Sequence, residues 1–580
     1  MTTAARKPIF SSGCHFDILI CLGLVLAVFV PYHQVAAHRF IEFDDGVYAF
    51  QNTYIIKGLC WDSICWAFTN TDSANWQPLT WISHFVDREI FGPHPGGYLL
   101  ENVAWHALAS CLCYLAFYKT TGRRLFAFTV ALFFAVHPTN VENVAWASER
   151  KSLLDAVFWF AAIISYLDFI ETRSFRSYGV TVIAHILGLL SKAMSITLPC
   201  TLVLIHVLYL VYHPDRRDPG SRPRHYVKGM LLPVVPLLAL SAYFTLVTIS
   251  AQSMAMPGTS LYSPGLRLIN VLRSYYRYIE MFFHPGELAN FYPLFQNELT
   301  FRSAIPAIVA LSAITIAVCL LVRRKPQLLI GWCWYLGTMV PVIGLVQVGS
   351  QSHADRYLYI PMLGLAFLYP VLFEELCSIG ALWRRAVAGV SLAILAVSMI
   401  AATQIQVSYW KDGVTLFRHS LSVTGNCVTS VMSLAAAYSR TGRYPEMIAF
   451  ADSQIATATN PDNKAKLSFF KASGLYNMQK YEAAIASAQK ALDWGDTSEV
   501  VYFILAASNY QMGNKEKAAQ YLAKAKTVHK PVNRTSLVEV EREDYTARLE
   551  LLVKETAAPN ENHDSQAPAA AGSSVSGTKN

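Results

Sequence analysis

The chain has 580 residues, of which 53% are hydrophobic and only 15% are charged, and its formal net charge is +8. Soluble domains carry about 25% charged residues, so this composition excludes an ordinary soluble enzyme and indicates a membrane protein. The apolar residues are concentrated before about residue 408, which predicts a membrane domain followed by a soluble one. The basic residues lie in short loops between apolar runs, which argues against nucleic-acid binding.

Eleven apolar segments are predicted to cross the membrane. The first follows Arg6 and Lys7, as a signal peptide would, but it is long enough to span and has no clear cleavage site, so we interpret it as a retained anchor. Several others are shorter than the ~20 residues of a perpendicular span, and their ends are expected to be buried in protein. The segments are 18–37, 99–118, 125–137, 152–170, 178–191, 195–212, 229–250, 304–322, 328–347, 357–378 and 387–407.

Clusters of Lys and Arg fall in alternate connections between these segments. The positive-inside rule makes that side cytoplasmic. We therefore predict a multi-pass protein of the cell inner membrane with a cytoplasmic N-terminus and with everything after Tyr409 in the periplasm. The clusters begin at Arg6, Lys119, Arg173, Arg216, Arg323 and Arg384.

The first outer loop carries two adjacent carboxylates, Asp44 and Asp45, followed by Gly46. A carboxylate is costly in hydrocarbon, so the pair should lie just beyond the membrane surface. Adjacent side chains point in different directions, so one acid can face a cavity while the other anchors the loop. The alternative is a solvated Asp-Asp-Gly turn.

Four basic residues stand in the outer loops against the positive-inside trend: Arg150, Lys151, Lys192 and Arg356. Arg offers a planar fork that suits phosphate and Lys a point charge, so we interpret the four as ligands of a shared anion; the alternative is plain surface residues. The histidines of these loops are His84, His137 and His353, and none has zinc-motif spacing, so hydrogen-bonded loop histidines are expected rather than a metal site.

Two further features of the outer loops are left open by the sequence. The amphipathic stretch 267–283 is interpreted as interfacial or re-entrant, because a span there would invert every later loop. Cys60 and Cys65 both lie in the first outer loop and can form a disulfide if their compartment is oxidising.

Beyond Trp410 the sequence repeats itself, and 482–485 aligns with 516–519 at a spacing of 34 residues. This is the period of the helix-turn-helix tetratricopeptide repeat; a generic stack of helical hairpins is the alternative. The predicted fold class is all-α, a polytopic membrane domain followed by an α-solenoid. The predicted domains are 1–408, a repeat domain at 409–555 with repeats at about 427–461, 464–497 and 498–531, and a disordered tail at 556–580.

Six short motifs follow one another in the outer loops: Phe43-Asp44-Asp45, Trp76 to His84, His137-Pro138 with Glu142, Glu149-Arg150-Lys151, Ser191-Lys192 and Asp355-Arg356-Tyr357. Together they resemble the transmembrane-and-tetratricopeptide-repeat O-mannosyltransferases and their bacterial relatives, over roughly residues 16–530. The resemblance implies a C-type polytopic glycosyltransferase fold, a polyprenyl-phosphate sugar donor and a catalytic acid in the first outer loop. The chain departs from the pattern at Ala193, where proline is expected, and in having only three repeats.

Site roles follow from the loops and the resemblance together. Asp44 and Asp45 are the predicted catalytic acids, and the resemblance favours the first of the pair as the base. The donor phosphate is expected on Arg356, Lys192, Arg150 and Lys151. Supporting roles are expected for His84, His137, Glu142, Asp355 and Tyr357.

The expected function is an inverting glycosyltransferase that moves a hexose such as mannose from a polyprenyl-phosphate donor to a protein Ser/Thr hydroxyl or another envelope acceptor. Such a donor carries its own leaving group, so the transfer needs one base and cations for the phosphate, and no metal or other cofactor is expected. The expected partners are the donor, membrane lipid and an acceptor bound by the repeats. The alternatives are a transporter for a lipid-linked sugar, with ionisable residues inside its spans, and a repeat-bearing scaffold for envelope assembly.

Overall fold

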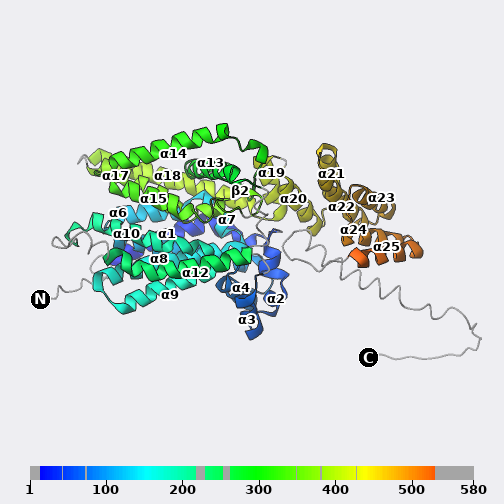
Figure 1. Cartoon of the computed structure of the whole chain (residues 1–580), viewed down its shortest axis with the longest axis horizontal. Coiled ribbons are helices and arrows are strands. Elements are labelled where there is room, and N and C mark those ends of the chain that lie inside the picture. Colours follow the sequence, from blue (N-terminus) through cyan, green and yellow to red (C-terminus); the bar gives the residue numbers. More distant parts are fainter. Residues whose placement is uncertain are drawn as a thin grey trace, which may run out of the picture. The chain divides into compact units, whose positions relative to one another are not determined.

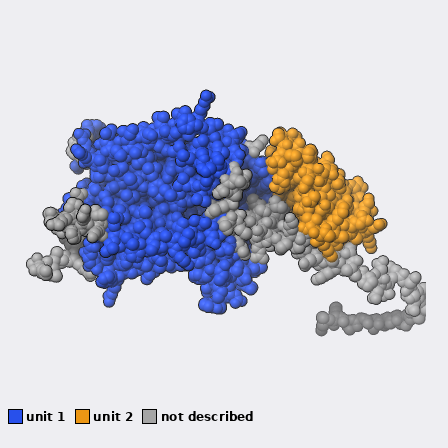
Figure 2. Space-filling view, viewed as in Figure 1, with its two compact units in different colours: residues 1–443, 532–537 blue, residues 444–531, 538–580 orange. Residues whose placement is uncertain are grey.

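The computed structural model describes residues 14–41, 43–71, 75–216, 229–252, 262–347, 349–378, 382–425 and 427–528, and they are mostly helical (Figure 1). They form two compact units, the first ending at Arg443 and the second running from Tyr444 to Val528 (Figure 2). The predicted all-α class is therefore confirmed. The described strands are β1 (Tyr292–Pro293) and β2 (Gln351–His353), which pair antiparallel.

Seven described helices of the first unit are long and apolar enough to cross a membrane. Each matches one predicted span, because an uninterrupted apolar run of this length favours a helix in lipid. They are α1 (Cys14–Tyr32) with η1 (His33–Ala37), α5 (Pro95–Thr121), η4 (Ala147–Glu149) with α8 (Arg150–Thr172), η5 (Ala193–Thr197) with α10 (Leu198–Tyr212), η7 (Leu232–Val234) with α12 (Val235–Gln252), α14 (Phe301–Leu321) and α18 (Leu382–Tyr409).

The predicted number of eleven spans is too high by this measure. The remaining four segments form helices that are bent, broken or short: α6 (Arg124–Val136), bent by 53° from η3 (Pro138–Asn140) and α7 (Val141–Val144), then α9 (Phe175–Ser191), α15 (Pro326–Met339), and α16 (Met362–Ala366) with α17 (Leu368–Ser378). Counting the bent pair as one span gives eight. An apolar sequence alone does not show where a helix bends, breaks or ends. These pieces instead bury much of their surface against neighbouring helices, as α6 does.

The two ends of the bundle hold different groups of charged residues. At one end, basic residues of the predicted cytoplasmic clusters pair with acids: Arg124 Nε lies 2.7 Å from Asp17 Oδ1, and Lys119 Nζ lies 2.6 Å from Asp168 Oδ1. The other end holds the loops with the predicted site residues. The predicted orientation of these ends in the membrane remains a prediction.

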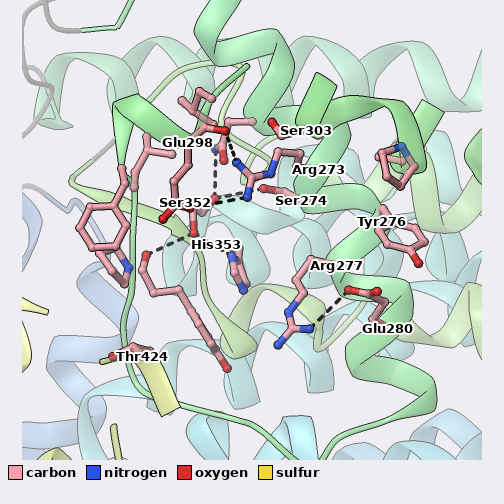
Figure 3. Close-up of a pocket in the computed structure, with 18 of the residues that line it drawn as sticks. Arg273, Ser274, Tyr276, Arg277, Glu280, Glu298, Ser303, Ser352, His353 and Thr424 are labelled. Carbon is pink, nitrogen blue, oxygen red and sulfur yellow. Dashed lines mark hydrogen bonds and ion pairs between the residues drawn. The ribbon is translucent and has the colours of Figure 1, made fainter. Parts of the chain in front are cut away.

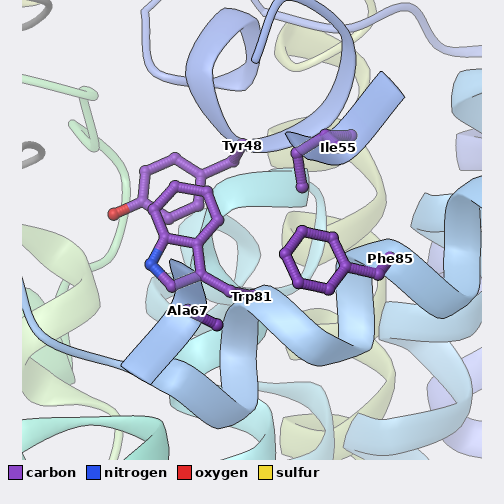
Figure 4. Packing of buried hydrophobic residues seen from close by; sticks show 5 residues of the cluster. All are labelled: Tyr48, Ile55, Ala67, Trp81 and Phe85. Atoms are coloured by element: carbon purple, nitrogen blue, oxygen red, sulfur yellow. The ribbon is translucent and has the colours of Figure 1, made fainter. Parts of the chain in front are cut away.

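The first outer loop folds around an aromatic cluster of its own (Figure 4). A short π-helical turn, η2 (Gly46–Phe50), precedes α2 (Thr53–Lys57), α3 (Trp61–Thr69) and α4 (Pro78–Phe91). Tyr48 of η2 stacks on Trp81 of α4 with ring centroids 4.4 Å apart, and Phe85, Ile55 and Ala67 are buried beside them. This packing fixes the backbone just after Asp45. Cys60 and Cys65 are free thiols.

The fourth outer loop forms α13 (Pro264–Phe283), which contains the predicted amphipathic stretch 267–283. It does not qualify as an apolar spanning helix. Tyr278 of α13 donates to the carbonyl oxygen of Ala354 at 3.1 Å and accepts from the Ala354 amide at 3.0 Å, so the helix holds the loop that carries Arg356. A helical turn, η8 (Gln296–Glu298), links β1 to α14, and η9 (Asp355–Leu358) follows β2.

The compact units divide later than the boundary predicted at 408–409. After α18 the chain forms α19 (Gly413–Thr424) and α20 (Val428–Arg440), which belong to the first unit. His419 of α19 stacks on Tyr409, with centroids 3.6 Å apart, and bonds the carbonyl oxygen of Leu288 at 2.9 Å. The composition changes where the spans end, whereas the units are set by such contacts.

The second unit consists of five helices packed in sequence: α21 (Tyr444–Thr457), α22 (Pro461–Asn477), α23 (Tyr481–Asp493), α24 (Glu499–Gln511) and α25 (Lys515–Val528). Each predicted repeat coincides with two consecutive helices, beginning with α20 and α21. Buried alanines such as Ala472 and Ala488 let the helices approach closely. Gly442 and Gly513 take positive φ, of 67° and 80°, in the tight turns between helices. Residues 529–580, with the predicted tail, lie outside the described residues.

Candidate active site

Asp45 is the structural member of the acid pair. Its side chain is buried, and it accepts hydrogen bonds from the Ile41 amide at 2.8 Å and from both the amide and the hydroxyl of Ser148, at 3.0 and 2.5 Å. Burial raises its pKa to about 6 in spite of these donors. A carboxylate this saturated has little capacity left for a substrate, and its evident role is to fix the first outer loop against the second.

Asp44 is the available member of the pair. It is half-buried, and its carboxylate makes no hydrogen bond to any residue that the structure describes. Burial raises its pKa, while Lys151 and Arg356 act in the opposite direction. Asp44 therefore combines an unoccupied carboxylate with nearby positive charge, which is the environment of a general base.

Three cations converge on one buried carboxylate, Glu149 of η4. Lys151 Nζ lies 2.9 Å from Glu149 Oε1, Lys192 Nζ lies 3.3 Å from Oε2, and Arg356 Nε lies 3.7 Å from Oε1. The glutamate side chain is only 1% exposed, whereas the three cations are 13–15% exposed. The buried Glu149 carboxylate thus holds the three cations close together, while their side chains stay partly exposed.

Arg356 is further oriented by Glu142. Its Nη1 lies 2.6 Å from Glu142 Oε1, and its amide donates to Oε2 at 2.7 Å. Its guanidinium lies over the rings of Trp146 and Tyr357, 5.8 and 4.9 Å from their centroids. This arrangement holds the fork rigidly while several of its N–H groups stay free to bind an anion.

The Lys192 loop is positioned from two sides. Thr80 of α4 donates to the carbonyl oxygen of Ser191 at 3.0 Å, and Lys192 Nζ donates to Ser152 Oγ at 2.6 Å. A small cavity of ≈ 10 Å³ lies between Lys192, Arg356 and Asp155, room for about one water molecule. The loop thereby brings its ammonium group to the same place as Arg356.

Arg150 does not lie with the other three cations. It is fully buried and is paired with Asp87 at 3.0 Å and Glu101 at 2.8 Å, and it donates to the carbonyl oxygen of Tyr98 at 2.9 Å. Successive helical residues point in different directions, so Arg150 faces the protein interior while Lys151 faces the site. We therefore leave Arg150 out of the phosphate site that the sequence predicted.

The supporting histidines are structural in their contacts. His84 is buried with Nδ1 3.3 Å from Asp87, and burial beside Arg150 keeps its pKa well below the ordinary value, so it is neutral. His137 bonds Thr139 Oγ1 at 2.8 Å and the carbonyl oxygen of Phe282 at 2.9 Å. Both are hydrogen-bonded, as predicted, but only His137 lies in a loop, because His84 stands within α4.

Asp355 and Tyr357 flank Arg356 as expected. Asp355 is buried and accepts from the hydroxyl of Tyr292 at 2.8 Å, and burial together with the Glu142 charge raises its pKa. Tyr357 carries the Arg356 guanidinium on its ring face. Among the described residues, no group of three or more His, Cys, Asp or Glu side chains is placed to hold a metal ion.

Sequence reasoning did not assign roles to four residues of the site: Trp146, Ser148, Ser152 and Glu149. All four are buried; Trp146, Ser148 and Glu149 lie between α7 and α8, and Ser152 lies in the first turn of α8. The signal was the acid in Glu149-Arg150-Lys151, whose carboxylate could have been recognised as the partner of the neighbouring cations.

Comparison with known proteins supports the resemblance of the outer loops. The chain is 30% identical over 204 residues to protein O-mannosyl-transferase Tmtc1 of Drosophila melanogaster, covering 34% of this chain and 24% of that protein. It is 24% identical over 442 residues to a protein O-mannosyl-transferase of Caenorhabditis elegans, covering 70% and 58%. The human protein O-mannosyl-transferase TMTC4 is 31% identical over 112 residues, covering 17% and 15%. The predicted resemblance to this family is thus confirmed.

These matches are partial. The chain spans between 15% and 58% of the three relatives, and no family model matches it. An oligosaccharyltransferase structure from Archaeoglobus fulgidus, tethered to an acceptor peptide, superposes with a TM-score of 0.34 at 14% identity, covering 75% of this chain and 59% of that one. A score this low does not establish a common fold.

Proposed function

We propose that the chain is a membrane glycosyltransferase that moves a hexose such as mannose from a polyprenyl-phosphate donor to a Ser/Thr hydroxyl of a protein or to another envelope acceptor. One observation carries the proposal: Asp44, a carboxylate without hydrogen bonds to described residues, is acted on by the charges of Lys151 and Arg356, which gather at Glu149 with Lys192. The names of the relatives support the same class of reaction.

Asp44 is the proposed general base. It takes the proton of the acceptor hydroxyl as the oxygen attacks the anomeric carbon of the sugar. The bond from that carbon to the phosphate oxygen breaks, and the polyprenyl phosphate leaves with the bonding electrons. Attack opposite the leaving group inverts the anomeric centre, and no second carboxylic acid is needed.

Lys151, Lys192 and Arg356 are the proposed phosphate ligands. The negative charge on the phosphate grows as the bond to the sugar breaks, so cations fixed before the reaction stabilise the transition state more than the ground state. Glu142 and Glu149 orient these cations. In our proposal the reaction takes place at the periplasmic face of the inner membrane, and the repeats help to bind the acceptor.

Sugar transfer by purified full-length protein in lipid vesicles tests the proposal. The donor is polyprenyl-phosphate [³H]mannose, and the acceptors are envelope proteins from cells that lack this chain. Asp44→Asn should lower transfer by ~10²–10⁴-fold, the usual contribution of a placed base. Arg356→Lys keeps the charge but loses the fork and should retain part of the activity, whereas Arg356→Ala should lose more. Glu375→Gln in α17, an exposed acid outside the proposed site, is the matched control.

Other results would point to the alternatives. Movement of the lipid-linked sugar across the vesicle membrane without transfer would indicate a transporter. Cells that lack the chain would lose envelope modification in every case. If wild-type and Asp44→Asn protein restored that modification equally, the chain would be a scaffold. Near wild-type transfer by both Asp44→Asn and Asp45→Asn would refute the proposed mechanism.

A further inference from the structure

A second cavity, of ≈ 470 Å³, lies beside the β1–β2 pair (Figure 3). It is open on one side and is lined by α13, both strands, the start of α14 and the end of α19, all in the first unit. The proposed mechanism makes no use of it. Its volume is in the range of small-ligand sites, and it holds both charged and apolar side chains.

The charged lining offers both donors and acceptors. Arg273 and Arg277 lie one turn apart on α13 and are 35% and 37% exposed, with Glu298 3.8 Å from the first and Glu280 3.3 Å from the second. Glu287 also lines the cavity. Three carboxylates against two guanidinium groups disfavour a phosphate, and so much charge disfavours an isoprenoid tail.

The remaining lining favours a polypeptide over a sugar. Sugars commonly bind on open aromatic faces, but the rings of Tyr292 and His353 are stacked on each other, with centroids 4.1 Å apart, which leaves Tyr276 and Phe295 as the other rings of the lining. The apolar wall combines aliphatic side chains with one exposed ring: Pro293, Leu294, Phe295, Leu299, Pro306 and Ala307. A peptide backbone presents alternating carbonyl and N–H groups that match guanidinium donors and carboxylate acceptors, and its side chains can pack on such a wall.

A half-buried histidine with a buried, unsatisfied ring nitrogen supplies an independent sign of a ligand. His353 accepts from or donates to Ser352 Oγ at 2.8 Å through Nδ1, while its buried Nε2 has no hydrogen-bond partner within the described chain. Burial and the two arginines lower the His353 pKa to about 3, so the ring is neutral and can serve a backbone amide or carbonyl. An unpaired polar atom at a cavity wall is costly unless something binds it.

The cavity is joined to the proposed active site through its wall. Tyr292 lines the cavity and donates to Asp355 at 2.8 Å, and Asp355 precedes Arg356. We infer that this cavity binds a segment of the acceptor polypeptide next to the residue that receives the sugar. This inference deepens the proposed function and rests on it for the identity of the polypeptide as acceptor.

Photo-crosslinking in the full-length protein tests the inference. Phe295→benzoylphenylalanine places a probe at a cavity residue that is 44% exposed, and Phe301→benzoylphenylalanine, 68% exposed and outside the lining, is the control. Crosslinking is done in native membranes with Asp44→Asn protein, so it does not depend on turnover. We expect at least fivefold more polypeptide adduct from position 295 than from position 301. The crosslinked peptides should be those whose Ser or Thr carries a hexose in wild-type cells and lacks it in cells that carry only Asp44→Asn.

Charge reversal supplies the second arm. Arg277→Glu should lower the adduct yield at position 295 by fivefold or more, whereas Arg302→Glu, exposed on α14 outside the lining, should leave it unchanged. In the transfer assay Arg277→Ala should raise the acceptor KM several-fold with little change in kcat. Adducts only with lipid or glycan, or equal yields at 295 and 301, would overturn the inference. Polypeptide adducts without any sugar transfer would instead refute the proposed function and leave a peptide site.

Discussion

At the scale of single residues, the structure separates two adjacent acids that the sequence could not separate. Adjacency predicts that they point in different directions, but Ser148, which saturates Asp45, is 103 positions away in the sequence. The resemblance favoured Asp44 as the base; the contacts show that Asp45 is occupied by structural hydrogen bonds, and the role of Asp44 stays a prediction. In the same way, Arg150 and Lys151 look equivalent in the sequence, yet only Lys151 reaches the site. The local sequence shows which residue types are present, whereas their hydrogen-bond and ion-pair partners lie in loops far away in the sequence.

The acid pair should respond differently to the same substitution. Asp45→Asn loses the acceptor of a buried amide or hydroxyl, which costs about 1–3 kcal/mol, so the thermal midpoint of the purified protein should fall. Asp44→Asn removes a half-buried charge that has no described hydrogen-bond partner, so its midpoint should equal or exceed that of wild type while sugar transfer is lost. Thermal unfolding and transfer are measured on the same samples. The opposite pattern, with Asp44→Asn destabilised and active, would exchange the two roles.

The pH dependence of transfer should report Asp44. Burial raises its pKa, so the base is protonated and inactive on the acid side, and activity rises as the pH increases through that pKa. Lys151 lowers the same pKa, so Lys151→Gln should move the acid limb of kcat/KM to higher pH. Lys411→Gln, at an exposed position of the first unit outside the proposed site, is a charge-matched control. An acid limb that stays in place in Lys151→Gln would mean that another group controls the profile.

At the scale of elements, the aromatic cluster of the first outer loop explains how a loop can hold the carboxylate that we propose as the general base. Tyr48 follows Asp44 by one helical turn and is clamped by Trp81 and by Gln77, whose Nε2 donates to the Tyr48 hydroxyl at 2.6 Å. The abundance of Trp in this loop was visible in the sequence. The sequence did not show which of these indole rings is buried. Trp61 is 74% exposed, whereas Trp81 is fully buried.

Removing the centre of that cluster should uncouple the loop. Trp81→Ala deletes a fully buried indole, a change that typically costs ~3–5 kcal/mol, and frees η2. We expect a lower thermal midpoint and a large loss of transfer, with Trp81→Phe intermediate in both. Trp61→Ala, at an exposed position of α3, serves as control. Full activity in Trp81→Ala would show that the Asp44 turn is held by Asp45 alone.

At the scale of the whole molecule, composition predicted the all-α class and the positions of the apolar helices. By length and apolarity it gave more spans than the described part of the structure has, because a mostly apolar run such as 357–378 breaks between α16 and α17. The helices of the second unit were predictable from the 34-residue period. The aligned stretches 482–485 and 516–519 lie in the first turns of α23 and α25. The boundary between the units could not be predicted, because it depends on side chains such as His419 that contact residues far away in the sequence.

The boundary between units leads to a prediction about truncation. Phe417 of α19 packs near Phe43, with ring centroids 6.3 Å apart, and Phe43 directly precedes Asp44. A chain that ends at Arg443 keeps α19 and α20, whereas one that ends at Trp410 uncovers Phe43 and Tyr409. We expect the shorter chain to have the lower thermal midpoint in detergent and the weaker donor binding, both measured beside the full-length protein. If the two truncated chains unfold at the same temperature, α19 adds no stability to the membrane unit, and the boundary at 408–409 describes the molecule better.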